Sequence, residues 1–244
     1  MKKLIMMATL VLPCLFLNAQ EKQIRLGVKI GANFSVFTRD VAPFWGTVAP
    51  KYQYFRPTGR SSGMGGITAD FSVKRRFSLG AELLFNSRGM AYSEENNYVY
   101  ETDNDGSETQ AYNRYNFNVD YLEVPVTANL HFYPRGNVKL SAYAGLAPSI
   151  AVHGKSKLRY AKGVDGDGYR ANNESAKLDN VRYSNNSALI GFQVGGLEGG
   201  RSKVQPFLDL RGSYMLRSVF SGTGRGSLMD TRMFTGTFSF GVKF

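Results

Sequence analysis

The residues that could support acid–base or nucleophilic chemistry are few. The chain has two histidines and one cysteine. His153 lies close in sequence to Ser149 and Ser156, and a histidine beside a serine hydroxyl is the pairing that activates a serine nucleophile. The other histidine is His131, which the alternation described below places near the end of a strand. No catalytic motif surrounds His153, so the sequence predicts no catalytic residue and no enzyme.

Clustered acidic oxygens could bind calcium at two places. Residues 103–106 read Asp-Asn-Asp-Gly, and residues 165–168 read Asp-Gly-Asp-Gly. Calcium takes oxygen ligands of this kind, but neither run has the spacing of an EF-hand loop or its closing glutamate. We interpret both runs as exposed turns, and the sequence predicts no metal and no cofactor.

A third group of chemically interesting residues consists of charged side chains inside segments that are otherwise apolar at every second position. They are Arg25, Lys29, Asp70, Glu82, Glu123, Asp209 and Arg211. In a narrow barrel these charges would point into the lumen, where an unpaired charge is unfavourable. We therefore predict a lumen charge network, to which Lys139 also contributes. It could serve a gated pore or proton path, but a structural plug is the simpler interpretation.

The N-terminus has the pattern of a signal peptide. Lys2 and Lys3 precede an apolar stretch at residues 4–17, and Ala19 offers a small residue for cleavage. The only cysteine, Cys14, lies in this stretch after Pro13, which does not fit a lipoprotein signal. We predict a signal peptide at residues 1–20 and one domain at residues 21–244. Without cysteine, that domain excludes disulfides, thiolate metal sites and cysteine nucleophiles.

The remaining sequence alternates between apolar and polar residues in a set of separate segments. Residues 24–36 are apolar at every even position, a period of two that indicates a strand. Seven further segments show the same pattern, in the regions 65–74, 77–86, 117–132, 138–152, 186–196, 204–214 and 234–244. Pro125 interrupts the fourth of these and is expected to mark a bulge or a bend beside Glu123, because proline cannot donate to a ladder.

The connections between these segments alternate in length. Short ones fall at 74–76, 133–137 and 199–203, and long polar ones at 37–62, 87–115, 153–185 and 217–232. This alternation is typical of a transmembrane β-barrel. We predict an all-β, eight-stranded antiparallel transmembrane barrel with long extracellular loops, short periplasmic turns and both termini in the periplasm.

Strand period alone does not decide which face points outward. A soluble lipocalin-like barrel would turn its apolar face inward, whereas a membrane barrel turns it toward lipid. The charges on the polar face and the loop lengths favour lipid outside. Aromatic residues near segment ends also fit an interfacial girdle: Phe34, Phe37, Phe71, Phe77, Phe132, Tyr133, Phe234 and Phe244.

The C-terminus and two internal runs resemble a known family. Phe240, Val242 and Phe244 end the chain in alternation, as in strands read by the barrel-assembly machinery. Together with residues 27–35 (GVKIGANFS) and 121–126 (YLEVPV), they resemble the PorT-type outer membrane β-barrel family of Bacteroidetes, with a relation to small OmpA-type barrels. The resemblance implies a place in the outer membrane. The protein after which the family is named takes part in type IX protein secretion.

The expected function is therefore that of a non-enzymatic outer membrane protein, acting through surface loops or as an accessory of an envelope or secretion complex. A narrow porin for small solutes and a lipid A-modifying enzyme are the alternatives. The expected partners are outer membrane lipid or lipopolysaccharide, the barrel-assembly machinery and secretion components. The net charge of +11 would suit nucleic acid, but an exported protein is not expected to meet it.

Overall fold

The structure is a computed structural model that describes residues 24–38, 56–74, 76–102, 106–132, 138–159, 174–178, 180–196, 204–221 and 231–244. The regular elements in these residues are β-strands. They are β1 (Ile24–Phe37), β2 (Arg56–Pro57), β3 (Arg60–Lys74), β4 (Phe77–Thr102), β5 (Glu108–Glu123), β6 (Val126–Phe132), β7 (Val138–Arg159), β8 (Glu174–Lys177), β9 (Ser184–Gly196), β10 (Gln205–Met215) and β11 (Met233–Lys243). Within the described ranges, no helix is long and apolar enough to cross a membrane.

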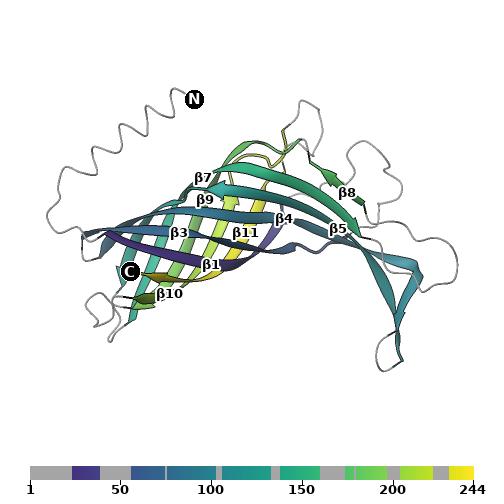
Figure 1. The fold of residues 1–244 in the computed structure, drawn as a ribbon, viewed down its shortest axis with the longest axis horizontal. Coiled ribbons are helices and arrows are strands. Elements are labelled where there is room, and N and C mark those ends of the chain that lie inside the picture. The colour runs from purple at the N-terminus through teal and green to yellow at the C-terminus, as the bar shows by residue number, and fades with distance from the viewer. Residues whose placement is uncertain are drawn as a thin grey trace.

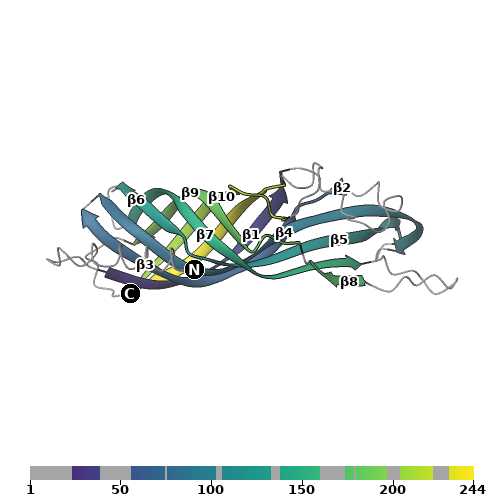
Figure 2. The same cartoon turned by 90° about the horizontal axis from the view of Figure 1, so that it is seen from above.

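The strands close into a ring. β1 pairs with β3 on one side and with β11 on the other, and every pairing around the ring is antiparallel. The wall runs β1–β3–β4–β5/β6–β7–β9–β10–β11, because β5 and β6 are successive parts of one strand that pairs with β4 and β7. Figures 1 and 2 show this closed, tilted wall. The predicted eight-stranded antiparallel barrel is confirmed.

Pro125 interrupts the fourth wall strand without shifting its register. On β4 the pairs Leu84–Glu123 and Ala81–Val126 flank the interruption, so the same number of residues lies between them on both strands. Of the two predicted alternatives, the bulge at Pro125 is therefore wrong. The proline lacks the amide proton for the ladder, but its carbonyl still accepts a hydrogen bond from the Glu82 amide at 2.9 Å.

The two ends of the barrel differ. Ile24 and Phe244 lie at one end, here called the terminal end, together with the short β3–β4, β6–β7 and β9–β10 connections. At the other end, here called the loop end, β4, β5 and β7 continue well beyond the other wall strands (Figures 1 and 2). Residues 87–102, 108–115 and 153–159 of the connections predicted at 87–115 and 153–185 are therefore strand, and the wall strands reach into regions that were expected to be loop.

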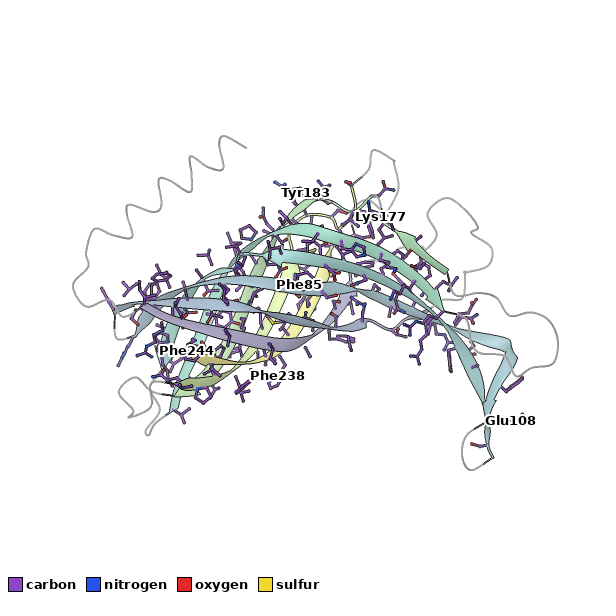
Figure 3. The ribbon with its side chains drawn as sticks, in the orientation of Figure 1. Phe85, Glu108, Lys177, Tyr183, Phe238 and Phe244 are labelled. Carbon is purple, nitrogen blue, oxygen red and sulfur yellow. The ribbon has the colours of Figure 1, made fainter. Side chains whose placement is uncertain are left out.

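The apolar face of the wall points outward. Ile30, Ile190 and Phe238 are 70%, 67% and 57% exposed, while their polar strand neighbours Lys29 and Ser239 are buried. Figure 3 shows this outer layer of side chains, with Phe85, Phe238 and Phe244 labelled. The orientation excludes the lipocalin-like alternative, because that fold would bury the apolar face.

Most aromatic residues of the predicted girdle also face outward, but one does not. Phe37 is only 7% exposed and packs inside the ring. Its odd position places it on the inner face of β1, opposite to the lipid-facing even positions. Tyr133 lies outside the described residues.

The amphipathic pattern inverts along the axis of the barrel. On β4, Phe85 points outward and Asn86 inward, but beyond them Ser93 lies on the outer face whereas Met90 and Tyr92 are buried inside. The wall is therefore apolar outside and polar inside near the terminal end, and polar outside and apolar inside at the loop end. The second arrangement is that of a water-soluble β-protein.

Candidate functional site

Four charged residues meet in the middle of the barrel. We call Lys29, Glu82, Asp209 and Arg211 the charge cluster; they come from β1, β4 and β10. Lys29 Nζ lies 2.8 Å from Glu82 Oε1 and 3.2 Å from Asp209 Oδ2. Arg211 donates to the same Glu82 oxygen at 2.8 Å. Two cations and two carboxylates balance formally, which lets a low-dielectric interior hold them.

The remaining hydrogen-bonding capacity of Asp209 is used by neutral side chains. Tyr143 Oη donates to Asp209 Oδ1 at 2.5 Å, and Ser239 Oγ donates to Oδ2 at 3.2 Å. Arg211 Nε donates to the same tyrosine oxygen at 3.0 Å. These contacts link β7, β10 and β11 across the lumen, and a cavity of about 20 Å³ borders the cluster at Glu82, Asp209 and Arg211.

A second polar layer lies between the charge cluster and the loop end. Arg88 donates to Glu123 Oε2 at 2.9 Å, and Asn86 donates to the same oxygen at 2.9 Å. Asn33 continues the network by donating to Asn86 at 2.6 Å, and Thr237 donates to Asn33 at 2.7 Å. The chain of contacts joins β5, β4, β1 and β11.

The terminal end holds a small polar cavity of about 40 Å³. Its lining includes Arg25, which donates to Gln205 at 2.8 Å, and Asp70, which forms an ion pair with Lys243. Lys139 also lines it. The cavity is the mouth of the lumen at this end.

His131 also lines this cavity. Its Nδ1 lies 2.8 Å from Ser141 Oγ, and its Nε2 lies 2.9 Å from Ser78 Oγ. One hydroxyl donates to the ring and the other accepts from it, so both nitrogens are satisfied whichever tautomer is present. This arrangement joins three strands through the imidazole, because His131 is on β6, Ser78 on β4 and Ser141 on β7.

The loop end of the lumen is closed by apolar side chains. We call the buried group Phe37, Met90, Tyr92, Phe117, Val119, Tyr121, Met215, Val219, Phe220 and Met233 the loop-end cluster. Phe220, which follows β10, lies 5.9 Å from the Phe37 ring of β1 and 6.2 Å from the Phe117 ring of β5 (centroid distances). The Phe37 and Phe117 rings themselves lie 6.0 Å apart, so three rings from different parts of the wall meet inside the lumen.

Backbone contacts hold this closing segment in place. Val219 donates its amide to Thr231 at 2.8 Å and accepts from the Arg182 amide at 2.8 Å. Phe220 forms an isolated bridge with Val181. The segment is therefore held by the residues that precede β11 on one side and by those that precede β9 on the other.

Farther out, Glu94 lies on the β4 extension. Partial burial raises the pKa of its carboxyl above the ordinary value, although a hydrogen bond from the Asn113 amide opposes the shift.

The structure brings together only part of the predicted charge network. Lys29, Glu82, Asp209 and Arg211 meet in the charge cluster, whereas Glu123 binds Arg88, a residue that the prediction placed in a loop. Arg25 and Asp70 lie farther toward the terminal end, at the cavity. Sequence reasoning also missed Tyr143, although its position on the polar face of β7 was the signal that could have found it.

The formal catalytic candidate does not assemble. His153 is exposed on the outer face of β7, whereas Ser149 and Ser156 are buried on the inner face. The predicted turn at 165–168 lies outside the described residues. So do residues 103–105 of the turn predicted at 103–106. Among the described residues, no group of three or more His, Asp or Glu side chains is placed to hold a metal ion.

Comparison with known proteins identifies the class of barrel. The profile of the outer membrane protein beta-barrel domain matches residues 18–221. The chain belongs to this family. As a member of the outer membrane barrel family, it places its exposed apolar belt against the lipid of that membrane. Phe240 and Phe244 of the predicted assembly signal lie on this outer face of β11 and its end, 47% and 62% exposed, and Val242 is half-buried between them.

Solved structures similar to this outer membrane barrel include Neisserial surface protein A from Neisseria, at 11% identity and a TM-score of 0.43, covering 92% of this chain and 98% of that one. Ail, the attachment invasion locus protein of Yersinia pestis, has 14% identity and a TM-score of 0.34, covering 90% and 98%. The complex of Ail with the heparin analogue sucrose octasulfate has 13% identity and a TM-score of 0.33, and the match covers 91% of this chain and 99% of that one. No curated protein matches the sequence.

Proposed function

We propose that this outer membrane barrel is a non-enzymatic, non-conducting protein that acts through its loop-end extension. The observation that carries the proposal is Phe220, which meets Phe37 and Phe117 inside the ring and closes the lumen. Behind this closure, the charge cluster places paired side chains across the lumen at the level of the membrane. A porin needs a continuous aqueous path, and two successive closed layers argue against one.

The orientation is part of the proposal. With an even number of wall strands, both termini lie on one side, and we place that side in the periplasm. The loop end then lies outside the cell, where long connections of such barrels are found. The extension formed by β4, β5 and β7 then projects on the outer side, beyond the ends of the other wall strands (Figure 1).

The finer role that we propose is that of an accessory in an envelope complex. The resemblance of residues 27–35 and 121–126 to PorT-type barrels supports membership of a protein secretion system. The packed extension supports it as well, because a preformed surface loses less conformational freedom on binding than a flexible loop.

Planar bilayer recordings test the closed lumen. Purified wild-type protein and the variant Phe220→Ala are compared, with Phe238→Ala on the lipid face as the control. We expect no stable conductance steps from any of them, because the charge cluster still closes the lumen without Phe220. Reproducible open steps from the wild type would exclude the non-conducting role and favour a narrow porin.

Site-specific photo-crosslinking tests the accessory role. A crosslinking residue replaces Tyr100 or Ser175 at the loop end, Arg76 at the terminal-end turn, or Ile190 on the lipid face. We expect capture of one defined envelope protein from the loop end or the turn but not from Ile190. If no defined protein is captured from these positions, or if cells lacking the protein have a changed lipid A composition, the proposed role is contradicted.

A further inference from the structure

Two polar cavities lie next to each other in the lumen on the terminal-end side of the charge cluster. The cavity at the mouth has a volume of about 40 Å³, and the one that borders the charge cluster, here called the inner cavity, has about 20 Å³. Both are lined by Asp70, Asn129, Gln193, Phe207 and Lys243. These five side chains therefore form the boundary between the mouth of the lumen and the charge cluster.

A glycine leaves room for the inner cavity. Gly80 lies on the inner face of β4, two positions before Glu82. A Cβ at Gly80 would lie 2.5 Å from Thr127 Oγ1 and 3.3 Å from Asp70 Oδ1, and both of these residues line the inner cavity. Any other residue at this position would therefore crowd the space beside Glu82.

Exposure of the charged side chains decreases from the mouth toward the interior. The side chain of Asp70 at the mouth is 22% exposed and that of Glu82 in the charge cluster is 13% exposed, whereas that of Lys29 is 1% exposed. Glu82 lines the inner cavity, and Lys29 lines neither cavity. The Glu82 side of the cluster is therefore the side that water can reach from the terminal end.

Two polar atoms on the wall of the inner cavity have no hydrogen-bond partner in the part of the chain that the structure describes. They are Thr68 Oγ1 and Glu82 Oε2. Thr68 and Glu82 are direct partners across β3 and β4, so their Cβ atoms are about 5 Å apart. Because buried polar groups in folded proteins are almost always hydrogen-bonded, these two atoms indicate a small ligand that contacts both.

Charge and size indicate that this ligand is water. The other carboxylate oxygen of Glu82 already accepts from Lys29 and from Arg211, each at 2.8 Å, and the four charges of the cluster balance. An added ion would leave a net charge in a low-dielectric interior, which is unfavourable. A water molecule needs roughly 10–15 Å³, so the inner cavity of about 20 Å³ holds one.

Lys243 separates the inner cavity from the mouth through three contacts. It forms an ion pair with Asp70, donates to Gln193 Oε1 at 3.2 Å, and places its Nζ 4.6 Å from the centroid of the Phe207 ring. A partly exposed ion pair adds little stability, so the Lys243 side chain can leave this position and let water pass. The loop-end cluster closes the opposite route.

We propose that the lumen contains a one-sided path for water. A water molecule bound in the inner cavity bridges Thr68 and Glu82, and it exchanges with solvent past Lys243 but not through the loop end. The path ends at the charge cluster, so it agrees with a non-conducting lumen. The inference goes beyond the proposed function, and it depends neither on the accessory role nor on the orientation in the membrane.

Removal of the Thr68 hydroxyl tests the bound water. Thr68→Val keeps the shape of the side chain. Thr235→Val is the matched control, because Thr235 Oγ1 also has no partner among the described residues but lines neither cavity. The folding equilibrium constant is read from reversible urea transitions in lipid vesicles. We expect Thr68→Val to lower it about fivefold, as for one lost hydrogen bond, whereas Thr235→Val should not lower it.

A Thr68→Val variant that is as stable as the wild type, or more stable, would overturn the bound water. That result would mean that the hydroxyl is unpaired, because removal of an unpaired buried hydroxyl relieves the cost of its desolvation. An equal loss of stability in Thr235→Val would overturn it as well, because the loss would then not depend on the cavity.

Thiol labelling in detergent micelles tests the route. The reagent is a small water-soluble methanethiosulfonate, and a Cys14→Ser background removes the only cysteine of the chain. Thr68→Cys places a thiol at the inner cavity. Ser187→Cys places one on the buried inner wall between the charge cluster and the loop end, where it serves as the control position.

We expect Lys243→Ala to raise the labelling rate of Thr68→Cys about fivefold, the effect of losing one partly exposed ion pair, and to leave the rate of Ser187→Cys unchanged. Phe220→Ala at the loop end should not accelerate labelling of Thr68→Cys. An unchanged rate at Thr68→Cys with Lys243→Ala, or a faster one with Phe220→Ala, would overturn the one-sided path.

Discussion

Replacing Lys29 by methionine would measure how dry the interior of the barrel is. The ammonium group is buried and contacts Glu82 at 2.8 Å and Asp209 at 3.2 Å. Lys29→Met keeps the volume but leaves Arg211 alone with two carboxylates. Removal of one partner from a buried ion pair costs about 3–5 kcal/mol, because the other charge stays buried.

A second substitution should restore much of that stability. Asp209→Asn alone leaves an excess cation and is expected to cost a similar amount. Combined with Lys29→Met, it returns the cluster to neutrality around the Arg211–Glu82 contact at 2.8 Å. We expect the double variant to lose at least about 2 kcal/mol less than the sum of the single losses, within the coupling range of contacting groups.

The free energy of unfolding is read from reversible urea transitions in lipid vesicles, followed by gel mobility and far-ultraviolet circular dichroism. Lys74→Met at the exposed end of β3 is the control and should change it by less than about 0.5 kcal/mol. A loss below about 1 kcal/mol for Lys29→Met would match a solvated ion pair. That result, or additive single losses, would refute a closed interior.

Three further predictions use the same urea transition. Phe117→Ala should lower the free energy of unfolding by about 3–5 kcal/mol, because the ring is 4% exposed; Phe238→Ala on the lipid face should cost less. Gly66→Ala should cost about 1–3 kcal/mol, since its Cβ would lie 2.0 Å from a β4 carbonyl oxygen, whereas Gly236→Ala has no atom within 4 Å and should be near neutral. His131→Phe should cost about 1–3 kcal/mol, because two serine hydroxyls lose their ring partner. The packing described would be contradicted by a smaller loss for Phe117→Ala than for Phe238→Ala, or by a smaller loss for Gly66→Ala than for Gly236→Ala. No loss of stability for His131→Phe would contradict it as well.

The membrane-level wall could be predicted from the sequence because one rule governs it. Along β1, Ile30 must meet lipid and Lys29 must avoid it, so a period of two fixes which face each residue takes. The number of strands and the outward apolar face follow from counting such segments. The ring closure of β1 on β11 then follows, since lipid cannot satisfy an open edge.

The extension could not be predicted because the same strands obey the opposite rule beyond the lipid. Past Phe85, the outer positions face water and the inner ones pack together, so the pattern changes phase at the membrane edge. Met90 and Tyr92 break the apolar-outward alternation, and residues 87–115 consequently resembled a polar loop. For the same reason Phe37 looked like a girdle residue.

Which side chains contact each other in the lumen also could not be predicted from the sequence. Alternation places Glu123 inside the ring, but only the cross-strand register decides that it meets Arg88 and not Arg211. Register depends on how each strand slides against its neighbours, and a single strand carries no record of this. Closeness in sequence likewise singled out the wrong histidine. His131 and not His153 has hydroxyl partners, and these serines, Ser78 and Ser141, come from other strands.

The change of phase at Phe85 is tested most directly by spin labels placed one at a time on β4, at Leu83, Phe85, Ser93, Met90 and Tyr92. Collision with oxygen reports lipid, and collision with a water-soluble nickel complex reports solvent. The structure predicts high oxygen access at the first two positions, high nickel access at Ser93, and little access to either probe at Met90 and Tyr92. Oxygen access that continues to Ser93, or nickel access at Met90 and Tyr92, would contradict the inverted, closed loop end.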